Sequence, residues 1–405
     1  MNSTHRVNVV KIEEVLPHSN ADTLGIVYIG GYQVVVKKDD FKIGDLAIYV
    51  QPDTIVPATE PFKFLWADRE FADGTVPERL RRITVRRFRK EWSEGLLMPL
   101  STFGQVVSAT SFRVLCKDST ALPPSATLGQ CSSYTLVGEG DDVAELLGFK
   151  HYEEPETIAN IQGKRQLPKR PHSLRGWFFY ILAKLHIYRT AVYGTDQTKP
   201  PKQFCPVYDV EGFKNYPRTF AEDEVVVVTE KIHGSNARYI FTSDDQKMHV
   251  GSHNYWRSEA STCIWRRALK EFPWIEEFCK AHPDYTVYGE VVPTQGGYRY
   301  GCAKDQIKFF VFDVLKPDGT FVDKQDLYPM DPLSLGQHLV PLLYHGKFDL
   351  PSIKALIDGK AKSRLDESHL MEGIVISSET ERIVRGLGRA QLKWKSMAFL
   401  EKEVA

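Results

Sequence analysis

The first hundred residues consist of short runs of β-branched and aromatic residues separated by turn residues, and this pattern limits the folds open to that part of the chain. The candidate strands are 7–15, 24–28, 32–36, 46–50, 82–88 and 95–100. The pair Gly30-Gly31 lies between two of these strands and predicts a hairpin. Short strands at regular spacing over about a hundred residues are typical of a small β-barrel. We therefore expect a barrel in residues 1–103.

A basic patch lies within this predicted barrel. Its members are Arg79, Arg81, Arg82, Arg86, Arg87, Arg89 and Lys90, with the aromatic residues Phe88 and Trp92 between and after them. A basic barrel surface that carries aromatic side chains is typical of an oligonucleotide-binding (OB) fold. The alternative interpretation is an edge strand whose charges prevent aggregation. The residues alone leave both interpretations open.

Beyond the barrel, the sequence predicts a connector at 104–205 and an α+β domain at 206–405. The connector holds a short helix at 141–148, a segment at 163–203 that is rich in Lys, Arg and Pro, and a candidate amphipathic helix at 177–189. In the α+β domain, the candidate strands are 222–230, 285–292, 307–314, 373–377 and 391–395. Helical periodicity runs over 264–279 and is interrupted at Pro273.

Composition excludes several classes of protein. A hydrophobic content of 42% with 12% aromatic residues is enough for packed cores and excludes a disordered chain. The formal net charge of zero predicts no bulk attraction to nucleic acid. The six cysteines contain no CxxC pair, which is typical of reduced thiols inside cells. With no apolar signal core and no span of membrane length, we expect a soluble, cytoplasmic protein without a membrane partner.

The run Val225–Thr229 predicts a buried strand that stops at a lysine. Lys231 follows it and is itself followed by His233, Gly234, Ser235 and Asn236. An amine at the end of a strand, close to a glycine that permits close approach, can act as a covalent nucleophile once it has lost its proton. Most strand-end lysines are simply solvated, so this segment alone does not decide the function.

Four further segments carry chemistry in a fixed order after Lys231. A strand ends at Glu290, an aromatic strand at 309–314 places Phe310 and Phe312 on one face, and Glu372 begins a buried strand before Gly373. The last segment is Lys393-Trp394-Lys395, in which the pleat puts both lysines on one face. Each segment has an ordinary structural explanation when taken singly. Their order along the chain is the informative observation.

That order resembles the covalent nucleotidyltransferase superfamily of polynucleotide ligases and capping enzymes, and the Lys-x-His-Gly form is most similar to its RNA ligase branch. The resemblance implies an ATP-grasp-like adenylation domain of mixed antiparallel sheets and helices, preceded here by an OB-like barrel. It also implies ATP-dependent joining of 3′-hydroxyl and 5′-phosphate ends at a nick. Only ten residues follow Lys395, which argues against a DNA ligase or an RNA-capping nucleotidyltransferase. A non-catalytic RNA-binding protein is the third alternative.

By this resemblance, Lys231 carries the AMP as a lysyl-AMP intermediate, and Lys393 and Lys395 stabilise charge on the phosphates. Glu290 and Glu372 are the expected ligands of Mg²⁺ or Mn²⁺, which prefer oxygen. The expected nucleotide-binding residues are Glu230, Ile232, Asn236, His253, Glu290, Phe312, Glu372, Lys393 and Lys395, with Phe312 stacking on adenine and Phe310 as second choice. Cations beside Lys231 would favour its neutral, attacking form.

The expected substrate is a nicked RNA duplex or RNA/DNA hybrid, bound by a monomer. Its expected contacts are Asn236, Arg238, Arg257, Arg86, Arg87 and Arg89. One departure concerns the segment about twenty residues past the lysine, where the resembling ligases carry a Ser-Arg pair. Here the chain has Ser252-His253-Asn254, so either His253 or Arg257 takes the place of the arginine.

Overall fold

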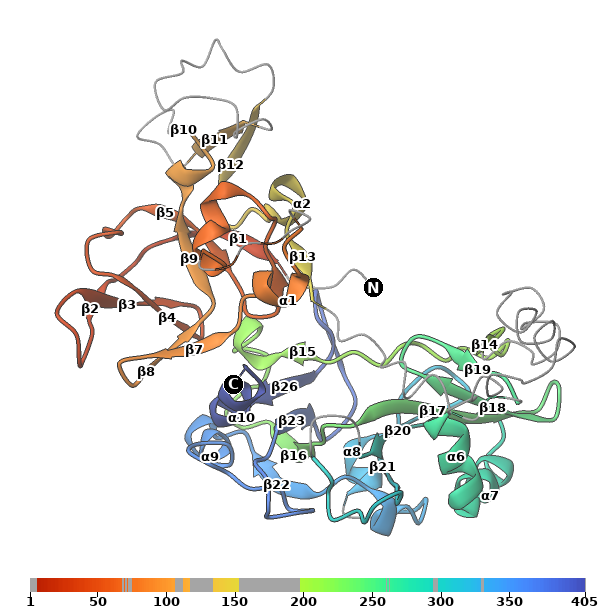
Figure 1. Ribbon diagram of the computed structural model, residues 1–405. Coiled ribbons are helices and arrows are strands. Elements are labelled where there is room, and N and C mark those ends of the chain that lie inside the picture. Colours follow the sequence, from red (N-terminus) through yellow and green to blue (C-terminus); the bar gives the residue numbers. More distant parts are fainter. Residues whose placement is uncertain are drawn as a thin grey trace, which may run out of the picture. The chain divides into compact units, whose positions relative to one another are not determined.

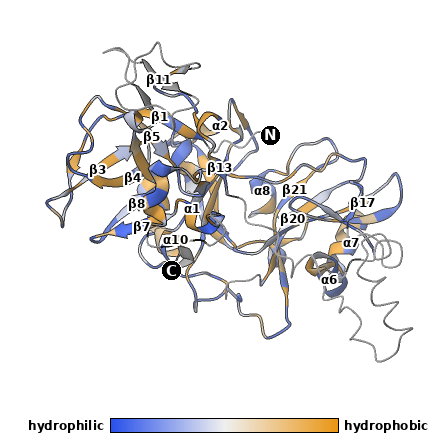
Figure 2. Cartoon of the chain, turned by 45° about the horizontal axis from the view of Figure 1, so that its top comes forward, coloured by the Kyte–Doolittle hydropathy of each residue, from blue (hydrophilic) through white to orange (hydrophobic). Residues whose placement is uncertain are grey.

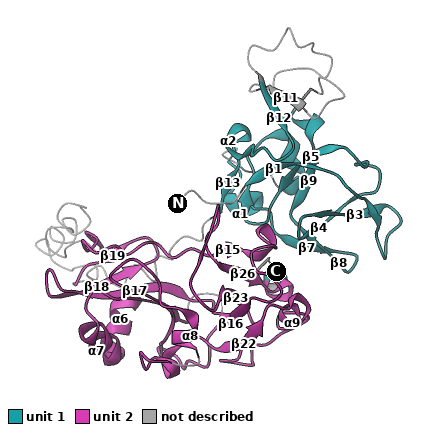
Figure 3. Ribbon diagram, turned by 180° about the vertical axis from the view of Figure 1, so that it is seen from behind, with its two compact units in different colours: residues 1–153, 400–405 teal, residues 154–399 magenta. Residues whose placement is uncertain are grey.

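The computed structural model describes residues 6–67, 69, 71, 75–105, 112–116, 134–152, 197–259, 261, 263–293, 298–328 and 331–404. The chain divides into two compact units, residues 1–153 with 400–405, and residues 154–399 (Figure 3). The predicted division at 103 and 205 stays a prediction. The predicted helix at 177–189 and most of the basic segment at 163–203 lie outside the described residues.

The first unit is built mainly from short antiparallel strands (Figure 1). Its strands are β1 (Val7–Lys11), β2 (Leu16–Pro17), β3 (Leu24–Ile29), β4 (Tyr32–Lys37), β5 (Leu46–Val50), β6 (Thr54–Ile55), β7 (Val85–Phe88), β8 (Glu91–Glu94), β9 (Leu96–Pro99), β10 (Gly104–Gln105), β11 (Phe112–Cys116), β12 (Tyr134–Gly138) and β13 (Lys150–His151). Its short helices are η1 (Glu60–Leu65), α1 (Glu78–Arg81), η2 (Leu100–Thr102) and α2 (Ala144–Leu147).

Two apolar clusters hold these strands together. One lies around Val9, Ile48 and Phe62, and the other around Val27 and Tyr49, all of them almost fully buried. The predicted hairpin is confirmed, because β3 pairs with β4 up to Ile29 and Tyr32. The predicted strand 7–15 is shorter than expected and ends at Lys11. Strand β8 was not predicted, because its sequence Glu-Trp-Ser-Glu is polar.

The second unit holds a six-stranded sheet in the order β14-β19-β18-β17-β20-β21 and a five-stranded sheet in the order β15-β26-β23-β16-β22. The six-stranded sheet consists of β14 (Gln197–Thr198), β17 (Ser235–Thr242), β18 (Lys247–Ser252), β19 (Trp256–Arg257), β20 (Thr286–Val292) and β21 (Lys308–Leu315). The five-stranded sheet consists of β15 (Glu211–Gly212), β16 (Val225–Lys231), β22 (Leu342–Lys347), β23 (Gly373–Ser378) and β26 (Gln391–Lys395).

Short helices and a small strand pair complete this unit. They are η4 (Phe213–Asn215), α6 (Ile264–Glu271), α7 (Pro273–Ala281), α8 (Lys324–Leu327), η5 (Gly336–His338), α9 (Leu350–Ala355), and the pair β24 (Ile383–Val384) and β25 (Gly388–Arg389). The last helix, α10 (Met397–Val404), begins in this unit, and its residues from 400 on belong to the first unit. The predicted break at Pro273 is confirmed: α6 ends before it and α7 begins with it, since proline suits the first helical position but not the interior. The predicted strands around 225, 286, 308, 373 and 391 are all present.

Each sheet of the second unit has its own apolar cluster, one around Tyr239, Trp265 and Val311 and the other around Val226 and Ile376. Figure 2 shows hydrophobic and hydrophilic residues interspersed along the strands and helices of both units, as expected for elements with one buried face. Within the described part of the chain, the helices are too short or too polar to cross a membrane.

Candidate active site

The chain passes from one sheet to the other at the predicted lysine motif. Lys231 is the last residue of β16, and Ser235 is the first residue of β17. Between them, the His233 amide donates a hydrogen bond to the Tyr300 hydroxyl (2.7 Å), and the Gly234 amide donates to Glu290 Oε1 (3.0 Å). A Cβ on Gly234 would lie 2.4 Å from Glu290 Cγ, so only glycine fits this crossover. The close approach predicted for this glycine is therefore present.

A buried carboxylate gathers the cationic groups at this point. Glu372, which is 3% exposed, pairs with Lys231 Nζ at 2.7 Å and lies 4.0 Å from Lys395 Nζ. His233 Nδ1 is 3.7 Å from its other oxygen. Burial alone would raise the pKa of Glu372, but Lys231, His233 and Lys395 outweigh it and hold that pKa well below its usual range. The carboxylate is therefore charged at neutral pH and orients the Lys231 amine.

The two lysines of β26 come from the strand beside Glu372. Register pairs Lys393 with Val375 and Lys395 with Gly373. Leu392, on the opposite face, is fully buried, which leaves both lysines on the face that carries the site. Burial, together with Lys395 and Lys231, lowers the pKa of Lys393 to about 8. Lys393 therefore titrates close to physiological pH.

The six-stranded sheet contributes the second carboxylate. Cross-strand pairing places Asn236, Glu290 and Phe310 in one row across β17, β20 and β21, so that their side chains share a face. Burial raises the pKa of Glu290 to about 7, although Lys231 opposes the shift. The buried Oδ1 of Asn236 accepts no hydrogen bond from the described residues. This row thus holds polar groups ready for a ligand.

Two carboxylates of the site are candidate ligands for a divalent cation. Glu290 and Glu372 supply carboxylate oxygens, and the charge of Glu372 adds to the effect of burial in raising the pKa of Glu290. The described residues contain no cluster of three or more His, Cys, Asp or Glu that would enclose a metal ion. Mg²⁺ and Mn²⁺ commonly bind through one or two carboxylates and complete their shell with water and phosphate oxygens. The two glutamates fit that mode of binding and do not fit an all-protein cage.

Four other predicted nucleotide contacts lie on β16, directly after it, or on β21. Glu230 is 1% exposed, and its Oε2 accepts a hydrogen bond from the Arg364 amide (2.8 Å). Ile232 is buried in the apolar cluster of the six-stranded sheet. Phe312 is half-buried and packs against Tyr208, with their ring centroids 4.6 Å apart. Phe310 lies directly across from Glu290.

The predicted RNA contacts of this unit have different environments. Arg238 is 2% exposed, and its guanidinium donates to the carbonyls of Cys205, Ser252 and His253, so it shapes the segment that holds His253. Arg257 is fully buried and packs against the Trp265 ring. These positions favour His253 over Arg257 as the replacement for the usual arginine.

His253 is half-exposed and hydrogen-bonded to a carboxylate. Its Nε2 lies 3.0 Å from Asp209 Oδ1, and its Nδ1 lies 3.1 Å from Asn254 Oδ1. The bond to Asp209 raises the pKa of His253, while burial opposes the shift. A raised pKa lets this histidine carry a positive charge closer to neutral pH, as a phosphate contact requires.

In the first unit, the basic patch divides into structural and exposed arginines. Arg81 donates to the Val56 and Val76 carbonyls, and Arg82 pairs with Asp53 at 2.6 Å. Arg79 is exposed on α1, and the other exposed members are on the β7–β8 hairpin: Arg86, Arg87, Arg89 and Lys90. Arg89 and Lys90 form the turn of this hairpin, and both have positive φ.

The aromatic residues of this hairpin are close to its cations. The Arg87 guanidinium lies 4.0 Å from the centre of the Trp92 ring, and Phe88 is 44% exposed. Cationic groups of this kind bind the phosphate backbone of a nucleic acid, and accessible aromatic rings stack on its bases. The predicted contacts Arg86, Arg87 and Arg89 therefore share one exposed element.

Sequence reasoning missed a group of buried polar residues around Asp313. Tyr208, Lys324 and Arg389 converge on this carboxylate, from positions up to 105 residues away in the chain. A carboxylate within the apolar run of β21 was the available signal, because a buried charge requires partners. The partners themselves carry no local pattern.

Two family models match the chain. The RNA ligase model matches residues 224–395, and an OB-fold domain model matches residues 6–100. No curated protein matches the sequence.

Solved structures of one ligase are similar to the whole chain. The Naegleria gruberi RNA ligase with PPi has a TM-score of 0.67 and 20% sequence identity, and 99% of each chain is covered. A mutant of that ligase with ATP and Mn has a TM-score of 0.65 and 19% identity, and covers 99% of this chain and 100% of that chain. A mutant with AMP and Mn has a TM-score of 0.65 and 19% identity, and 98% of each chain is covered. This likeness shows a shared fold.

The fold is that of a ligase, with an OB-fold domain before a mixed α+β RNA ligase domain. More specifically, residues 224–395 match the RNA ligase family model. The predicted family resemblance, the predicted α+β fold class with its OB-like domain, and the predicted class of enzyme are thereby confirmed.

Proposed function

We propose that the protein joins the 3′-hydroxyl and 5′-phosphate ends of a nicked RNA duplex or RNA/DNA hybrid, with ATP as the source of energy. Lys231 Nζ attacks the α-phosphorus of ATP, a P–N bond forms, and the P–O bond to pyrophosphate breaks. The AMP then passes to the 5′-phosphate, and the 3′-hydroxyl displaces AMP to form the phosphodiester bond. The protein acts as a monomer.

The observation that carries this proposal is the group Lys231, Glu372 and Lys395. A lysine amine held 2.7 Å from a buried carboxylate, with further cationic groups beside it, is a preorganised site for attack on a phosphate. Lys393 and Lys395 are placed to stabilise the charge of the leaving pyrophosphate. Lys231 is the last residue of β16, Glu372 directly precedes β23, and Lys393 and Lys395 are on β26.

ATP and a divalent cation are the proposed ligands. The similar Naegleria gruberi ligase was solved with ATP and Mn, which supports both for this chain. Glu290 and Glu372 would hold Mg²⁺ or Mn²⁺, and the bound ion would neutralise charge on the phosphates. Glu230, Ile232 and Asn236 would contact the nucleoside, and Phe312 or Phe310 would stack on adenine.

The proposal is tested by transfer of AMP from the protein to a nick. The protein is incubated with α-labelled ATP and Mg²⁺ or Mn²⁺, freed from nucleotide, and given a nicked duplex. We expect a protein–AMP adduct that seals the nick without added ATP. GTP labelling would instead favour a capping nucleotidyltransferase, and sealing only of all-DNA nicks would favour a DNA ligase.

Lys393 predicts a pH dependence for adduct formation. Its pKa of about 8 means that it is charged below that pH and neutral above it. If its charge stabilises the phosphates, kcat/KM for ATP falls as the pH rises through about 8, because kcat/KM reports the groups of the free enzyme. In Lys393→Arg, we expect this decline to move to higher pH, since a guanidinium keeps its proton. An unchanged alkaline limb in Lys393→Arg would assign the decline to another group.

The β7–β8 hairpin predicts a separable RNA-binding step. Replacing Arg86, Arg87 and Arg89 together with alanine is expected to weaken binding of nicked RNA about tenfold or more at 0.1 M salt, and to reduce the dependence of binding on salt. Adduct formation with ATP alone should be unchanged. The matched control replaces the exposed lysines Lys37, Lys38 and Lys42 of the same unit with alanine. Equal weakening by the two triple variants would contradict a specific role for the hairpin.

A further inference from the structure

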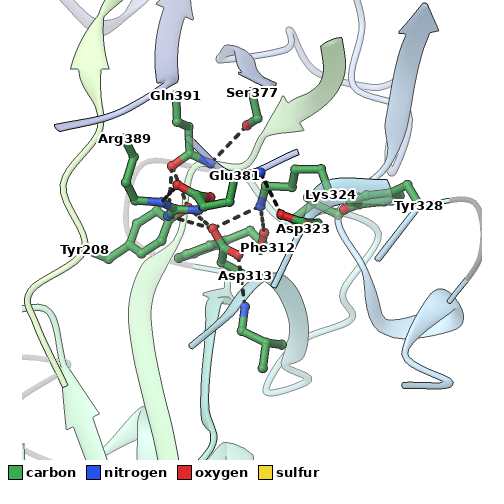
Figure 4. Close-up of polar contacts among 12 residues, drawn as sticks. Tyr208, Phe312, Asp313, Asp323, Lys324, Tyr328, Ser377, Glu381, Arg389 and Gln391 are labelled. Carbon is green, nitrogen blue, oxygen red and sulfur yellow. Dashed lines mark hydrogen bonds and ion pairs between the residues drawn. The ribbon is translucent and has the colours of Figure 1, made fainter. Parts of the chain in front are cut away.

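A buried ionic cluster in the second unit lies outside the residues assigned to nucleotide chemistry. Its centre is Asp313, fully buried on β21 of the six-stranded sheet. Oδ2 of Asp313 lies 2.9 Å from Arg389 Nη1 and 3.0 Å from Lys324 Nζ. Burial would raise the pKa of Asp313, but Arg389 and Lys324 outweigh it and lower that pKa. Asp313 is therefore charged and paired with both the Arg389 and the Lys324 side chains (Figure 4).

The cationic members are themselves fixed by further contacts. Arg389 donates to both oxygens of Glu381, at 2.8 and 2.6 Å, in the bidentate geometry that restricts a guanidinium most. Lys324 donates to the Phe312 carbonyl at 2.8 Å. Asp313 thus has two rigid partners, one from α8 and one from β25, which directly precedes β26.

Tyr208 links this cluster to β26, the strand that carries Lys393 and Lys395. Its hydroxyl lies 2.6 Å from Asp313 Oδ2 and 2.7 Å from Gln391 Oε1. Figure 4 shows Tyr208, Arg389 and Gln391 meeting beside Asp313. Gln391 is the first residue of β26, two positions before Lys393. The pleat places Gln391, Lys393 and Lys395 on one face of β26. A contact that holds Gln391 in place therefore restrains the strand segment from which the two lysines project.

The ring of Tyr208 rests on the other sheet. It packs against Tyr288 of β20 at 5.2 Å and against Phe312 of β21 at 4.6 Å. The chain after Tyr208 enters β15, whose Glu211 pairs with Leu392 of β26. Tyr208 therefore lies three residues before a strand of the five-stranded sheet, while its ring packs against the six-stranded sheet.

We infer that Tyr208, Asp313 and Arg389 form a clamp between the two sheets, and that this clamp positions Lys393 and Lys395 relative to Glu290. The three are positioning residues for the proposed transfer of AMP, and their role in the reaction rests on that proposed function. The sheets carry different halves of the site: Lys231, Glu372 and the two lysines come from the five-stranded sheet, and Glu290 comes from the six-stranded sheet. A shift of about 1 Å between such halves is enough to slow a reaction about 100-fold.

The test uses Tyr208→Phe in the full chain, because this substitution keeps the ring and removes only the hydroxyl. The matched control is Tyr239→Phe, which removes a buried hydroxyl bonded to the Trp265 carbonyl at 2.9 Å. We expect both variants to lose a similar part of their thermal stability. Only Tyr208→Phe should lower the rate of adduct formation at saturating ATP, by about tenfold, with KM for ATP changed less than about threefold.

A second readout does not depend on the proposed activity. Acetylation of Lys393 by acetic anhydride, followed by mass spectrometry with Lys247 as reference, is expected to rise severalfold in Tyr208→Phe and to stay unchanged in Tyr239→Phe. Increased acetylation without any adduct in the wild type would support the clamp and overturn the proposed function. An adduct in the wild type, with the rate and the acetylation of Tyr208→Phe both equal to those of Tyr239→Phe, would overturn the clamp.

Discussion

Replacing Glu372 with glutamine is expected to slow formation of the protein–AMP adduct by about 100-fold or more. The carboxylate is buried and lies 2.7 Å from Lys231 Nζ, so the variant removes the charge that orients the amine. A 100-fold loss of rate corresponds to about 3 kcal/mol of activation free energy, since each tenfold change is about 1.4 kcal/mol. The measurement is a single-turnover time course with labelled ATP and Mg²⁺.

Glu379 offers a matched control for this substitution. Glu372 directly precedes β23, and Glu379 directly follows it. Glu379 also pairs with a side chain of the same sheet, since its Oε1 lies 2.7 Å from His345 Nε2. Glu379→Gln is expected to form the adduct at the wild-type rate. Adduct formation by Glu372→Gln within about threefold of the wild type would remove Glu372 from the proposed mechanism.

The second large effect is expected from Gly234→Ala. An added Cβ would lie 2.4 Å from Glu290 Cγ and 2.8 Å from the Val291 carbonyl oxygen, so the crossover between the sheets must shift. Overpacking of this kind costs about 1–3 kcal/mol of stability. The crossover joins Lys231 on β16 to β17, the strand that pairs with Glu290 of β20. We therefore expect adduct formation to fall about 100-fold in protein that is still folded.

Gly346→Ala provides the comparison. Gly346 lies on β22 beside β16, and its Cβ would meet only the Tyr344 side chain, at 3.0 Å. A side chain can move aside, so this variant should keep most of its activity. Thermal unfolding and adduct formation are measured for both variants. Equal activity of the two variants would show that the crossover tolerates a side chain and that its geometry does not control the reaction.

The sequence predicted the local elements of the ligase domain well, because each has a strong short-range pattern. The β-branched run before Lys231 permits little except a buried strand, and Pro273 divides one helical pattern into α6 and α7. The alternation in Lys393-Trp394-Lys395 also predicted a shared face. These signals depend on neighbouring residues only.

The features that the sequence did not predict either depart from a local rule or depend on residues far apart. The β7–β8 hairpin turns at Arg89 and Lys90, which both have positive φ, whereas sequence rules expect glycine or asparagine there. The clamp joins Tyr208, Asp313 and Arg389 across more than one hundred and eighty positions, a distance over which periodicity carries no information. The orientation of Arg238 towards backbone carbonyls is likewise a product of tertiary packing.

The central claim is that Lys231 carries AMP for RNA end joining. The most direct measurement incubates the protein with labelled ATP and Mg²⁺ or Mn²⁺, maps the adduct by peptide mass spectrometry, and then adds a nicked RNA duplex without ATP. We predict AMP on Lys231 of β16, followed by its loss as the nick is sealed. An adduct on another residue, an adduct that persists in Lys231→Ala, or protein–AMP that does not seal the nick would contradict the account.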